Sequence, residues 1–183
     1  YTGSGVNACA HAMDKLRCKY LWRGMNLSTA DFALLDEQSD WSGIIENLGA
    51  VMVKPASEGS SIGMAPAKNA DELKAAYQVA KQFDPCVIAE RLIYGAEYTV
   101  TVLGSEVMPP IKLETDNKFY DYDAKYVDED TRYLVPCGLP SEKEDELKAL
   151  AAQAFNSLAC KDWGRVDVMA DEAGVFYVLE VNT

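Results

Sequence analysis

The chain has 183 residues, enough for one domain or two small ones, and its 49% hydrophobic content is sufficient to build a buried core. Its formal net charge of −12 argues against a nucleic-acid-binding surface. The single histidine, His11, argues against a His-based catalytic triad and a His-ligated zinc site. We expect His11 to be an ordinary helix residue.

Cysteines, apolar runs and chain ends set further limits. Five widely spaced cysteines without a CxxC pair indicate the reduced thiols of a cytosolic protein. No apolar run approaches the roughly 18 residues of a membrane-spanning helix, and no signal peptide is visible. We therefore expect a cytoplasmic protein without a membrane or nucleic-acid partner. Because the chain opens at Tyr1 rather than Met and stops within a polar motif at Thr183, we expect it to be part of a longer protein.

Two short helices are predicted near the amino terminus. Ser4 or Asn7 is placed to cap a helix over 8–13, and Asp14 is placed to cap a second helix. Lys15 falls in the first turn of that second helix, where a cation opposes the helix dipole. It either faces a bound anion or is a solvated lysine.

A strand over 32–35 and a helix over 40–47 precede a more informative segment. Residues 50–55 form a buried strand that carries Lys54 near its end, and the small-residue loop 56–63 follows. Gly and Ser let backbone N–H groups and hydroxyls approach a phosphate closely. The lysine precedes the glycines, so this is not a Walker A loop. The loop is either a phosphate cradle or a plain flexible turn.

A helix and two strands are expected next. Asn69 and Glu72 form a capping box at the start of the helix. The predicted buried face of this helix consists of Leu73, Ala76, Tyr77, Ala80 and Phe83. The strand over 87–90 runs into the segment 91–95, and a strand end with apolar neighbours and a free backbone edge can hold an adenine. The strand over 97–103 alternates, and its buried side carries Tyr98, Val100 and Val102.

An aromatic and acidic segment over 119–126 lacks a regular period. We interpret it as an ordered functional loop over a site; the alternative is an aromatic loop packed on a neighbour. Ser141 and Glu144 form a further capping box before a helix. The predicted buried face of that helix consists of Leu147, Leu150, Ala151, Ala154, Phe155 and Leu158.

The carboxyl-terminal segment, residues 164–183, is typical of a β-hairpin, because two runs rich in Val, Tyr and Phe flank a turn. Pairing Ala170 with Val175 would place Arg165 opposite Glu180. Alternation then predicts one face with Val166, Val168, Val175, Tyr177, Leu179 and Val181. The other face carries Arg165, Asp167, Glu180 and Asn182.

The polar face of this hairpin predicts a metal site. Asp and Asn are poor strand residues, so their presence needs a reason. Asp167, Glu180 and Asn182 offer hard oxygen ligands, which suit Mg²⁺ rather than zinc. Mg²⁺ on few protein carboxylates usually takes its other ligands from water and substrate phosphates. The alternative is a solvated face with a cross-strand Arg165–Glu180 pair.

Several segments together resemble one family over essentially all 183 residues. They are Val-Lys-Pro at 53–55, Glu-Gly-Ser-Ser-Ile-Gly-Met at 58–64, Phe-Tyr-Asp-Tyr-Asp-Ala-Lys-Tyr at 119–126, Gly-Arg-Val-Asp-Val-Met at 164–169 and Leu-Glu-Val-Asn-Thr at 179–183. They resemble the D-alanine–D-alanine ligases of the ATP-grasp superfamily, and the opening residues 1–5 and 13–16 also match. The resemblance implies an α+β ATP-grasp fold, with two α/β subdomains whose mostly antiparallel sheets clasp the nucleotide.

The implied domain boundaries and reaction follow from the same resemblance. Residues 1–14 would be the tail of an amino-terminal domain, 15–97 the central subdomain and 98–183 an incomplete carboxyl-terminal subdomain. In such ligases ATP phosphorylates the carboxylate of one D-alanine. The amine of a second D-alanine then attacks the acylphosphate, which yields the dipeptide used in peptidoglycan synthesis.

The resemblance also implies roles for single residues. ATP would be bound by Lys15, Lys54, Ser60, Ser61, Glu90, Arg91, Ile93, Glu97, Phe119 and Lys125. Two Mg²⁺ ions, or Mn²⁺, would be held by Asp167, Glu180 and Asn182. The implied catalytic residues are Ser60, Tyr126 and Arg165. Tyr126 would hydrogen-bond Ser60 and close the D-alanine site, and Arg165 would stabilise the tetrahedral oxyanion.

The sequence departs from the family at both ends, since the amino-terminal domain and the serine loop after Asn182 are absent. We therefore expect the 183-residue chain alone to be inactive as a ligase, and a homodimer is an option only for the full-length protein. Three alternatives stay open. They are a D-alanine–D-lactate ligase, another ATP-grasp carboxylate–amine ligase and a non-catalytic nucleotide-binding module.

Overall fold

The computed structural model describes residues 2–114 and 131–183, which form two compact units. Unit 1 combines Tyr1–Thr29 with Ile93–Thr183, and unit 2 is the intervening segment Ala30–Leu92. These packing units differ from the boundaries expected from the sequence, because the helix that begins at Lys15 packs with the carboxyl-terminal half of the chain. The expected boundaries stay a prediction about domains of the whole protein.

Unit 2 is an antiparallel sheet with two helices. Its strands are β1 (Phe32–Leu35), β2 (Val51–Pro55), β3 (Ala65–Ala67) and β4 (Val87–Arg91), and its helices are α3 (Trp41–Leu48) and α4 (Ala70–Ala80). The strands follow the order β1-β4-β2-β3 with every neighbouring pair antiparallel. Side chains of α4 pack on the sheet through Leu73, Ala76, Tyr77 and Ala80, which are all buried. Tyr77 also contacts the ring of Trp41 from α3.

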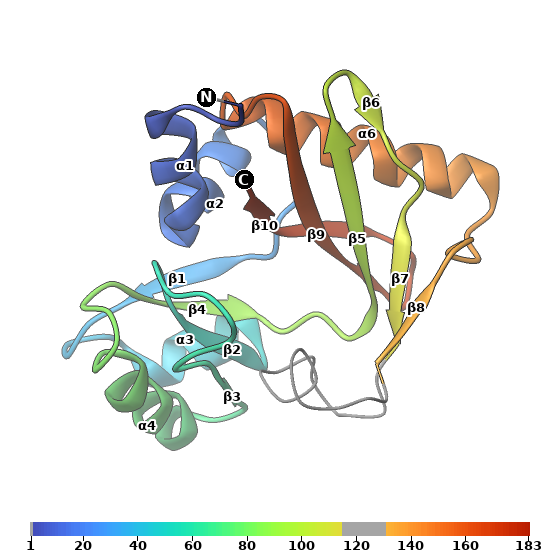
Figure 1. Ribbon diagram of the computed structural model, residues 1–183. Helices are drawn as coiled ribbons and strands as arrows, with labels where there is room; N and C mark the ends of the chain where they lie inside the picture. The colour runs from blue at the N-terminus through green and yellow to red at the C-terminus, as the bar shows by residue number, and fades with distance from the viewer. Residues whose placement is uncertain (1, 115–130) are drawn as a thin grey trace. The chain divides into compact units, whose positions relative to one another are not determined.

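The described residues of unit 1 form a larger sheet and three helices. Its helices are α1 (Val6–Met13), α2 (Lys15–Gly24) and α6 (Ser141–Ser157). Its strands are β5 (Gly95–Leu103), β6 (Glu106–Val107), β7 (Ile111–Glu114), β8 (Arg132–Leu134), β9 (Trp163–Asp171) and β10 (Phe176–Asn182). Among the described residues the order is β10-β9-β5-β7-β8, with β6 paired to β5. Helix α6 lies along the sheet and contacts β5, β9 and β10 (Figure 1).

The structure confirms some of the predicted helix caps and contradicts others. Asp14 caps α2 by accepting a hydrogen bond from the Arg17 amide, and Asn69 caps α4 by accepting from the Glu72 amide. The reciprocal half of the predicted capping box differs, because the Glu72 carboxylate accepts from the Lys68 amide and the Asn69 side chain. The predicted box at Ser141 is wrong, because α6 begins at Ser141 itself after Pro140 and no side chain caps it. No side chain caps α1 either, so the prediction for Ser4 or Asn7 is wrong too.

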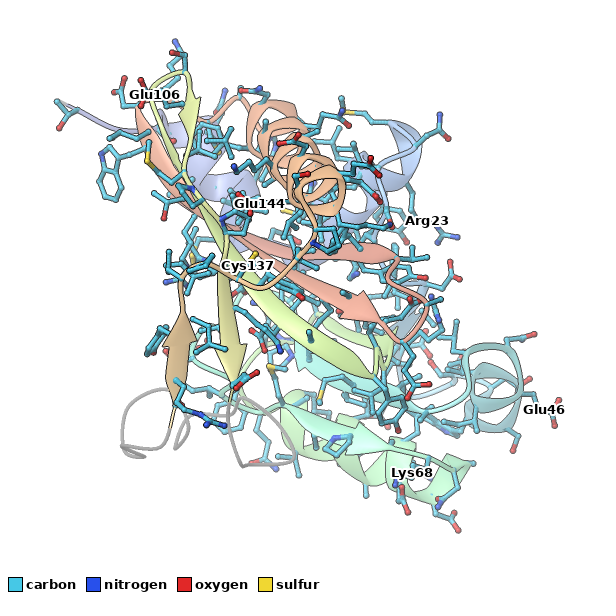
Figure 2. All side chains as sticks on the ribbon, turned by 90° about the vertical axis from the view of Figure 1, so that its right-hand side faces the viewer. Arg23, Glu46, Lys68, Glu106, Cys137 and Glu144 are labelled. Atoms are coloured by element: carbon cyan, nitrogen blue, oxygen red, sulfur yellow. The ribbon has the colours of Figure 1, made fainter. Side chains whose placement is uncertain are left out.

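Most predicted core positions are buried, with one exception. Leu147, Ala151, Ala154, Phe155 and Leu158 join one core with Tyr98, Val100 and Val102, while Leu150 packs against it partly buried. Phe83 is 49% exposed, because α4 ends at Ala80 and the helical period no longer applies beyond it. Charged side chains such as Glu46, Lys68 and Glu106 lie at the surface (Figure 2).

The register of the terminal hairpin differs from the prediction. The turn pairs Asp171 with Val175, and Val178 pairs with Val168; a β-bulge at Leu179 then shifts the register, so that Glu180 lies opposite Asp167. The predicted Arg165–Glu180 pairing is therefore wrong, since Arg165 pairs with Asn182. The prediction that Val175, Tyr177 and Leu179 share the face of Val166 is also wrong. An extra residue reverses the alternation, and the buried side chains are Phe176, Val178 and Val181.

Two further observations concern the sequence-based limits. No helix within 2–114 or 131–183 has the length and hydropathy needed to cross a membrane. The five cysteines all fall within these ranges and form no disulfide. Burial raises the pKa of the Cys18 thiol to about 12, and burial also raises the pKa of Cys160.

Candidate functional site

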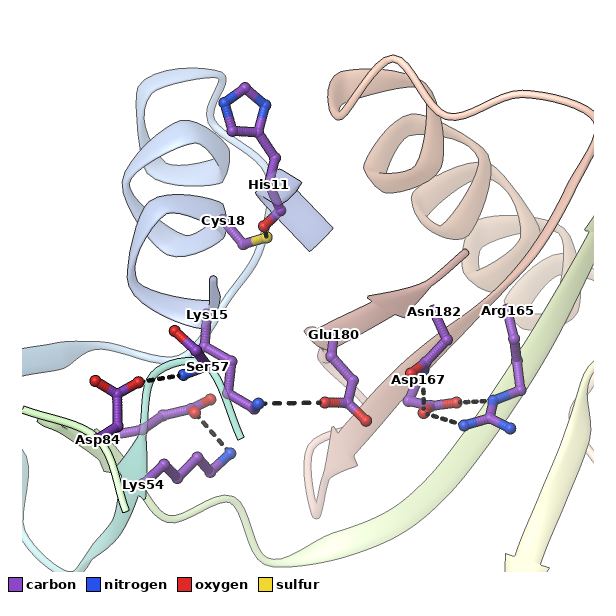
Figure 3. A network of polar contacts seen from close by, with 11 residues as sticks. His11, Lys15, Cys18, Lys54, Ser57, Asp84, Arg165, Asp167, Glu180 and Asn182 are labelled. Atoms are coloured by element: carbon purple, nitrogen blue, oxygen red, sulfur yellow. Dashed lines mark hydrogen bonds and ion pairs between the residues drawn. The ribbon is translucent and has the colours of Figure 1, made fainter. Parts of the chain in front are cut away.

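The polar face of the terminal hairpin gathers the predicted metal ligands in unit 1. The bulge brings Asp167 and Glu180 opposite each other on β9 and β10, and Asn182 and Arg165 are the next pair along the same face. Asn182 Nδ2 donates to Asp167 Oδ2 at 3.0 Å. Arg165 donates from Nε to Oδ1 and from Nη2 to Oδ2 of the same carboxylate, at 3.0 and 3.1 Å (Figure 3).

A threonine that the sequence did not single out completes the surroundings of Asp167. Thr99 on β5 pairs with Asp167 across the sheet, and its hydroxyl donates to Oδ1 at 2.7 Å. Both side chains are buried at 7% exposure. Alternation along β5 places Thr99 on the face of the sheet away from the core-facing Tyr98. Only the pairing of β5 with β9 shows that its partner on that face is Asp167. The sequence signal was thus incomplete without the sheet order.

The electrostatics of this face favour an added cation. Burial raises the pKa of Asp167; the Arg165 guanidinium lowers it, and the neighbouring Glu180 carboxylate raises it again. A directly opposed carboxylate pair carries two negative charges where one is already costly to bury. Lys15 supplies part of the compensation, because its Nζ lies 3.9 Å from Glu180 Oε2 (Figure 3).

Lys15 itself occupies the position that the sequence predicted. It is the first residue of α2, directly after the cap Asp14, and its side chain is 12% exposed. The partly buried ammonium therefore lies beside the carboxylates of the hairpin, and the fully solvated alternative does not apply. Two cations, two carboxylates and one amide of unit 1 together form one polar cluster, Lys15–Glu180–Asp167–Arg165–Asn182.

In unit 2 the predicted nucleotide residues begin with a buried ion pair. Lys54 on β2 and Glu90 on β4 lie on neighbouring strands, and Lys54 Nζ is 2.8 Å from Glu90 Oε2. The two residues are 8% and 2% exposed. An ion pair this buried is costly to form, so it is weak evidence for stability and better explained by a functional need for the charges. Arg91 continues the same strand, where it pairs with Val51.

The small-residue loop after β2 adopts a left-handed backbone. Ser60 and Ser61 have φ angles of 52° and 60°, and Gly63 has 69°. Left-handed conformations at non-glycine residues are costly, and they occur preferentially at functional sites. Ile62 N donates to Gly59 O at 3.1 Å and Met64 N donates to Ser61 O at 3.2 Å, so the loop is a defined pair of turns. The plain flexible turn is the weaker interpretation.

Asp84 and Phe83, which follow α4 in the chain, contact the two ends of this loop, and the sequence predicted this role for neither. Asp84, 9% exposed, accepts hydrogen bonds from Ser57 N and Cys86 N, each at 2.8 Å. Phe83 lies against the other end, since a Cβ added to Gly63 would meet Phe83 Cδ2 at 2.7 Å and Pro55 Cγ at 2.9 Å. Asp84 lies four residues beyond the end of α4, and Asp is a common residue in such turns, so the sequence offered no specific signal.

The remaining predicted residues divide between described and undescribed parts of the chain. Ile93 is 8% exposed and Glu97 is half-buried on β5, opposite Leu113 and Met169. Both belong to unit 1. The predicted roles of Phe119, Lys125 and Tyr126, and the loop over 119–126, lie outside the described residues.

The donors on the hairpin fit a hard divalent cation. Within residues 2–114 and 131–183, no group of three or more His, Cys, Asp and Glu side chains is arranged as a metal site. The predicted set has two carboxylates and one amide instead, which is too few for calcium or a structural zinc site. Few protein oxygens match Mg²⁺ or Mn²⁺, because these ions complete their shells with water and phosphate oxygens.

Comparison with known proteins gives the family. Residues 21–183 match the family described as D-ala D-ala ligase C-terminus. The chain belongs to this family. Its α+β architecture of antiparallel sheets is accordingly the ATP-grasp fold that the resemblance implied.

Relatives of this ligase family support the assignment over the whole chain. The D-alanine–D-alanine ligase of Saccharophagus degradans is 55% identical over 184 residues, which cover 100% of this chain and 59% of the relative. The crystal structure of the D-alanine–D-alanine ligase from Bacillus anthracis has a TM-score of 0.85 at 32% identity, and covers 100% of this chain and 60% of that one. Its complex with ATP gives 0.83 at 27% identity, covering 100% and 58%. The chain thus spans about 59% of the length of such relatives.

Proposed function

We propose that the longer protein to which this chain corresponds joins two D-alanine molecules into D-alanyl-D-alanine with ATP. The observation that carries the proposal is the paired-carboxylate face of β9 and β10 with Lys15 beside it, in a chain 55% identical to a protein named D-alanine–D-alanine ligase. The location of such an enzyme would be the cytoplasm, and its product would serve cell-wall peptidoglycan synthesis.

Asp167, Glu180 and Asn182 would hold the two Mg²⁺ ions, or Mn²⁺, that accompany ATP. Bound there, the metal would neutralise phosphate charge and let an anionic carboxylate approach an anionic γ-phosphate. The opposed pair Asp167–Glu180 and the raised pKa of Asp167 support this role. Both indicate that the negative charge here is unfavourable without a nearby cation, which a bound metal ion would supply.

The cationic side chains would handle the remaining charge. Lys15 and Lys54 would bind ATP phosphates, each already held beside a carboxylate in its own unit. Arg165 would stabilise the oxyanion of the tetrahedral intermediate. Its guanidinium is 52% exposed, so the face it does not use for Asp167 is accessible to a ligand. These placements support the roles without involving the undescribed residues.

Backbone and edge groups would bind the rest of the nucleotide. The loop at Ser60 and Ser61 would close over the γ-phosphate, because left-handed turns direct N–H groups and hydroxyls to an anion. The adenine edge would be lined by Glu90, Arg91 and Ile93, and the ribose would be held by Glu97. Phe119, Lys125 and Tyr126 would act from the lid, a role that rests on the resemblance alone.

The test is product identification with the full-length protein. It is incubated with Mg-ATP and D-alanine, then with D-alanine plus an excess of D-lactate, and the products are separated by mass spectrometry. D-alanyl-D-alanine in both reactions supports the proposal. A D-alanyl-D-lactate product would show that the acceptor is D-lactate instead of D-alanine. ATP binding without any ligated product would contradict the proposal and indicate a non-catalytic nucleotide-binding module. The 183-residue chain is expected to form no dipeptide.

A further inference from the structure

A fully buried lysine lies close to the hairpin but has no role in the proposed chemistry. Lys19 on α2 is 1% exposed, and it is flanked by the buried Cys18 and Trp22. Placing an ammonium group in such surroundings is costly unless the charge is well bonded. Its Nζ donates to Thr29 Oγ1 at 2.7 Å. The ammonium of Lys19 is therefore bound within the protein rather than solvated, and its bond to Thr29 identifies one group that it orients.

The hydrogen bonds beyond Thr29 lead to strand β10. Thr29 Oγ1 donates to the carbonyl oxygen of Val178 at 3.0 Å, and Val178 N donates to Ser28 O at 2.9 Å. Both backbone groups of Val178 on this edge are therefore held by residues 28 and 29. The lysine fixes the threonine hydroxyl as an acceptor from Nζ, so that its proton is directed at Val178.

Val178 is the residue at which the strand changes its alternation. It pairs regularly with Val168, and the register shifts between Val178 and Glu180. Because of this bulge, Glu180 lies opposite Asp167. With regular pairing Leu179 would lie there instead, and Glu180 would turn toward the core face. The edge contact at Val178 therefore holds the strand at the last residue before the shift that sets the position of Glu180.

We propose that Lys19 is a positioning residue for the metal-binding carboxylates, acting through Thr29 and Val178 on the bulge that presents Glu180. The inference rests on the proposed function, in which Glu180 holds a divalent cation. Lys15 lies one helical turn earlier on α2 and contacts Glu180 directly at 3.9 Å (Figure 3). Two lysines of one helix face thus address β10 on both sides of the bulge.

The test measures metal affinity rather than turnover. Mn²⁺ binding to the full-length protein with ATP is followed by electron paramagnetic resonance, for the wild type, Lys19→Met and Thr29→Val. Both variants remove the relay, one at the ammonium and one at the hydroxyl. We expect Mn²⁺ to bind about 10- to 100-fold more weakly in each, the range typical for lost support of a metal ligand. Thr29→Ser keeps the hydroxyl and should bind Mn²⁺ nearly as the wild type does.

Two controls separate positioning from general destabilisation. Lys81→Met removes a lysine of unit 2 that pairs with Glu37, and should leave Mn²⁺ affinity unchanged. In a Glu180→Gln background, Lys19→Met should weaken Mn²⁺ binding much less, because the ligand it positions is gone. If Lys19→Met does not fold, the comparison of Thr29→Val with Thr29→Ser still decides.

The outcomes distinguish this inference from the proposed function. If Glu180→Gln itself leaves Mn²⁺ binding unchanged, the metal role of the hairpin is wrong and the inference falls with it. If Glu180→Gln weakens binding but Thr29→Val binds Mn²⁺ like Thr29→Ser, the metal role stands and the inference about Lys19 is overturned.

Discussion

Two regions of the molecule that belong to the proposed site are built in different ways. On the hairpin of unit 1, charged side chains stand on a sheet, and the strand register decides which of them meet. In the loop of unit 2, the backbone itself is shaped, with φ angles of 52° and 60° at Ser60 and Ser61. The proposed role of the hairpin depends on the chemical identity of its side chains. The proposed role of the loop depends on the contacts that hold its two ends in place.

The difference predicts where each region is sensitive. On the hairpin, exchanging the buried Asp167 or the partly buried Glu180 for its amide removes charge and should lower activity directly. In the loop, the sensitive residues are Asp84, Phe83 and Gly63, which hold the ends and bear no resemblance to phosphate ligands. Substitutions graded by expected effect test this contrast.

The largest effect is expected from Glu180→Gln in the full-length protein. The variant keeps the shape of the side chain and removes one of two opposed charges on the hairpin. Mg²⁺-dependent ADP release should fall by about 10²- to 10³-fold, the typical loss when one electrostatic contact to a transition state is removed. Glu172→Gln, an exposed carboxylate in the turn of the same hairpin, is the matched control and should change little. Equal rates for wild type and Glu180→Gln would indicate a merely solvated face.

The next effect concerns the anchored end of the loop. Asp84→Asn puts an amide N–H toward one of two backbone donors, Ser57 N or Cys86 N, that the carboxylate now accepts. We expect KM for ATP to rise about tenfold, with kcat less affected, and the free energy of unfolding to fall by about 1–3 kcal/mol. Asp40→Asn is the control, since Asn caps a helix about as well as Asp at the start of α3. An unchanged KM for ATP would show that the Asp84 contacts do not affect ATP binding by the loop.

A smaller effect is expected at the other end of the loop. Gly63→Ala places a Cβ in a left-handed conformation and against Phe83, and should lower stability by about 1–2 kcal/mol. Thermal unfolding of Gly63→Ala with and without Phe83→Ala measures the steric part separately. The added Phe83→Ala change should cost less in the Gly63→Ala background than in the wild type. Simple additivity of the two changes would show that Phe83 does not confine the loop.

The smallest effect concerns the cysteines. Folding raises the pKa of Cys18 from its ordinary value of 9.0 to about 12, so the folded protein keeps a proton that the unfolded chain loses. Its contribution to stability is therefore complete below pH 9 and is lost as the pH rises toward 12. At pH 8, Ellman's reagent should react with the half-buried Cys9 and Cys86 long before Cys18. Rapid labelling of Cys18 in the folded protein would contradict this burial.

Local patterns in the sequence predicted the elements well and their pairing less well. The alternation of Tyr98, Val100 and Val102 identified the core face of β5, and Asp14 identified the start of α2. The bulge at Leu179 was not predictable, because one extra residue reverses the alternation without leaving a distinct composition. Phe83 was misassigned because periodicity does not reveal where a helix ends.

The candidate site divides along the same line. Asp167, Glu180 and Asn182 were found as polar residues on one face of a predicted hairpin. Lys15 and Lys54 were found by their positions at a helix start and a strand end, and the motif resemblance supplied their roles. Thr99, Asp84 and Lys19 were missed because each acts through a contact distant in sequence: Thr99 with Asp167, Asp84 with Ser57, and Lys19 with Thr29 and, through it, Val178. Such contacts depend on sheet order and on loop conformation, which local sequence does not specify.

The measurement that tests the central claim most directly is phosphate release by the full-length protein with Mg-ATP, recorded with and without D-alanine. The account predicts release that requires D-alanine and divalent metal together, and that is lost when Asp167 or Glu180 is replaced by its amide. Release that ignores D-alanine, or that persists in both amide variants, would contradict it.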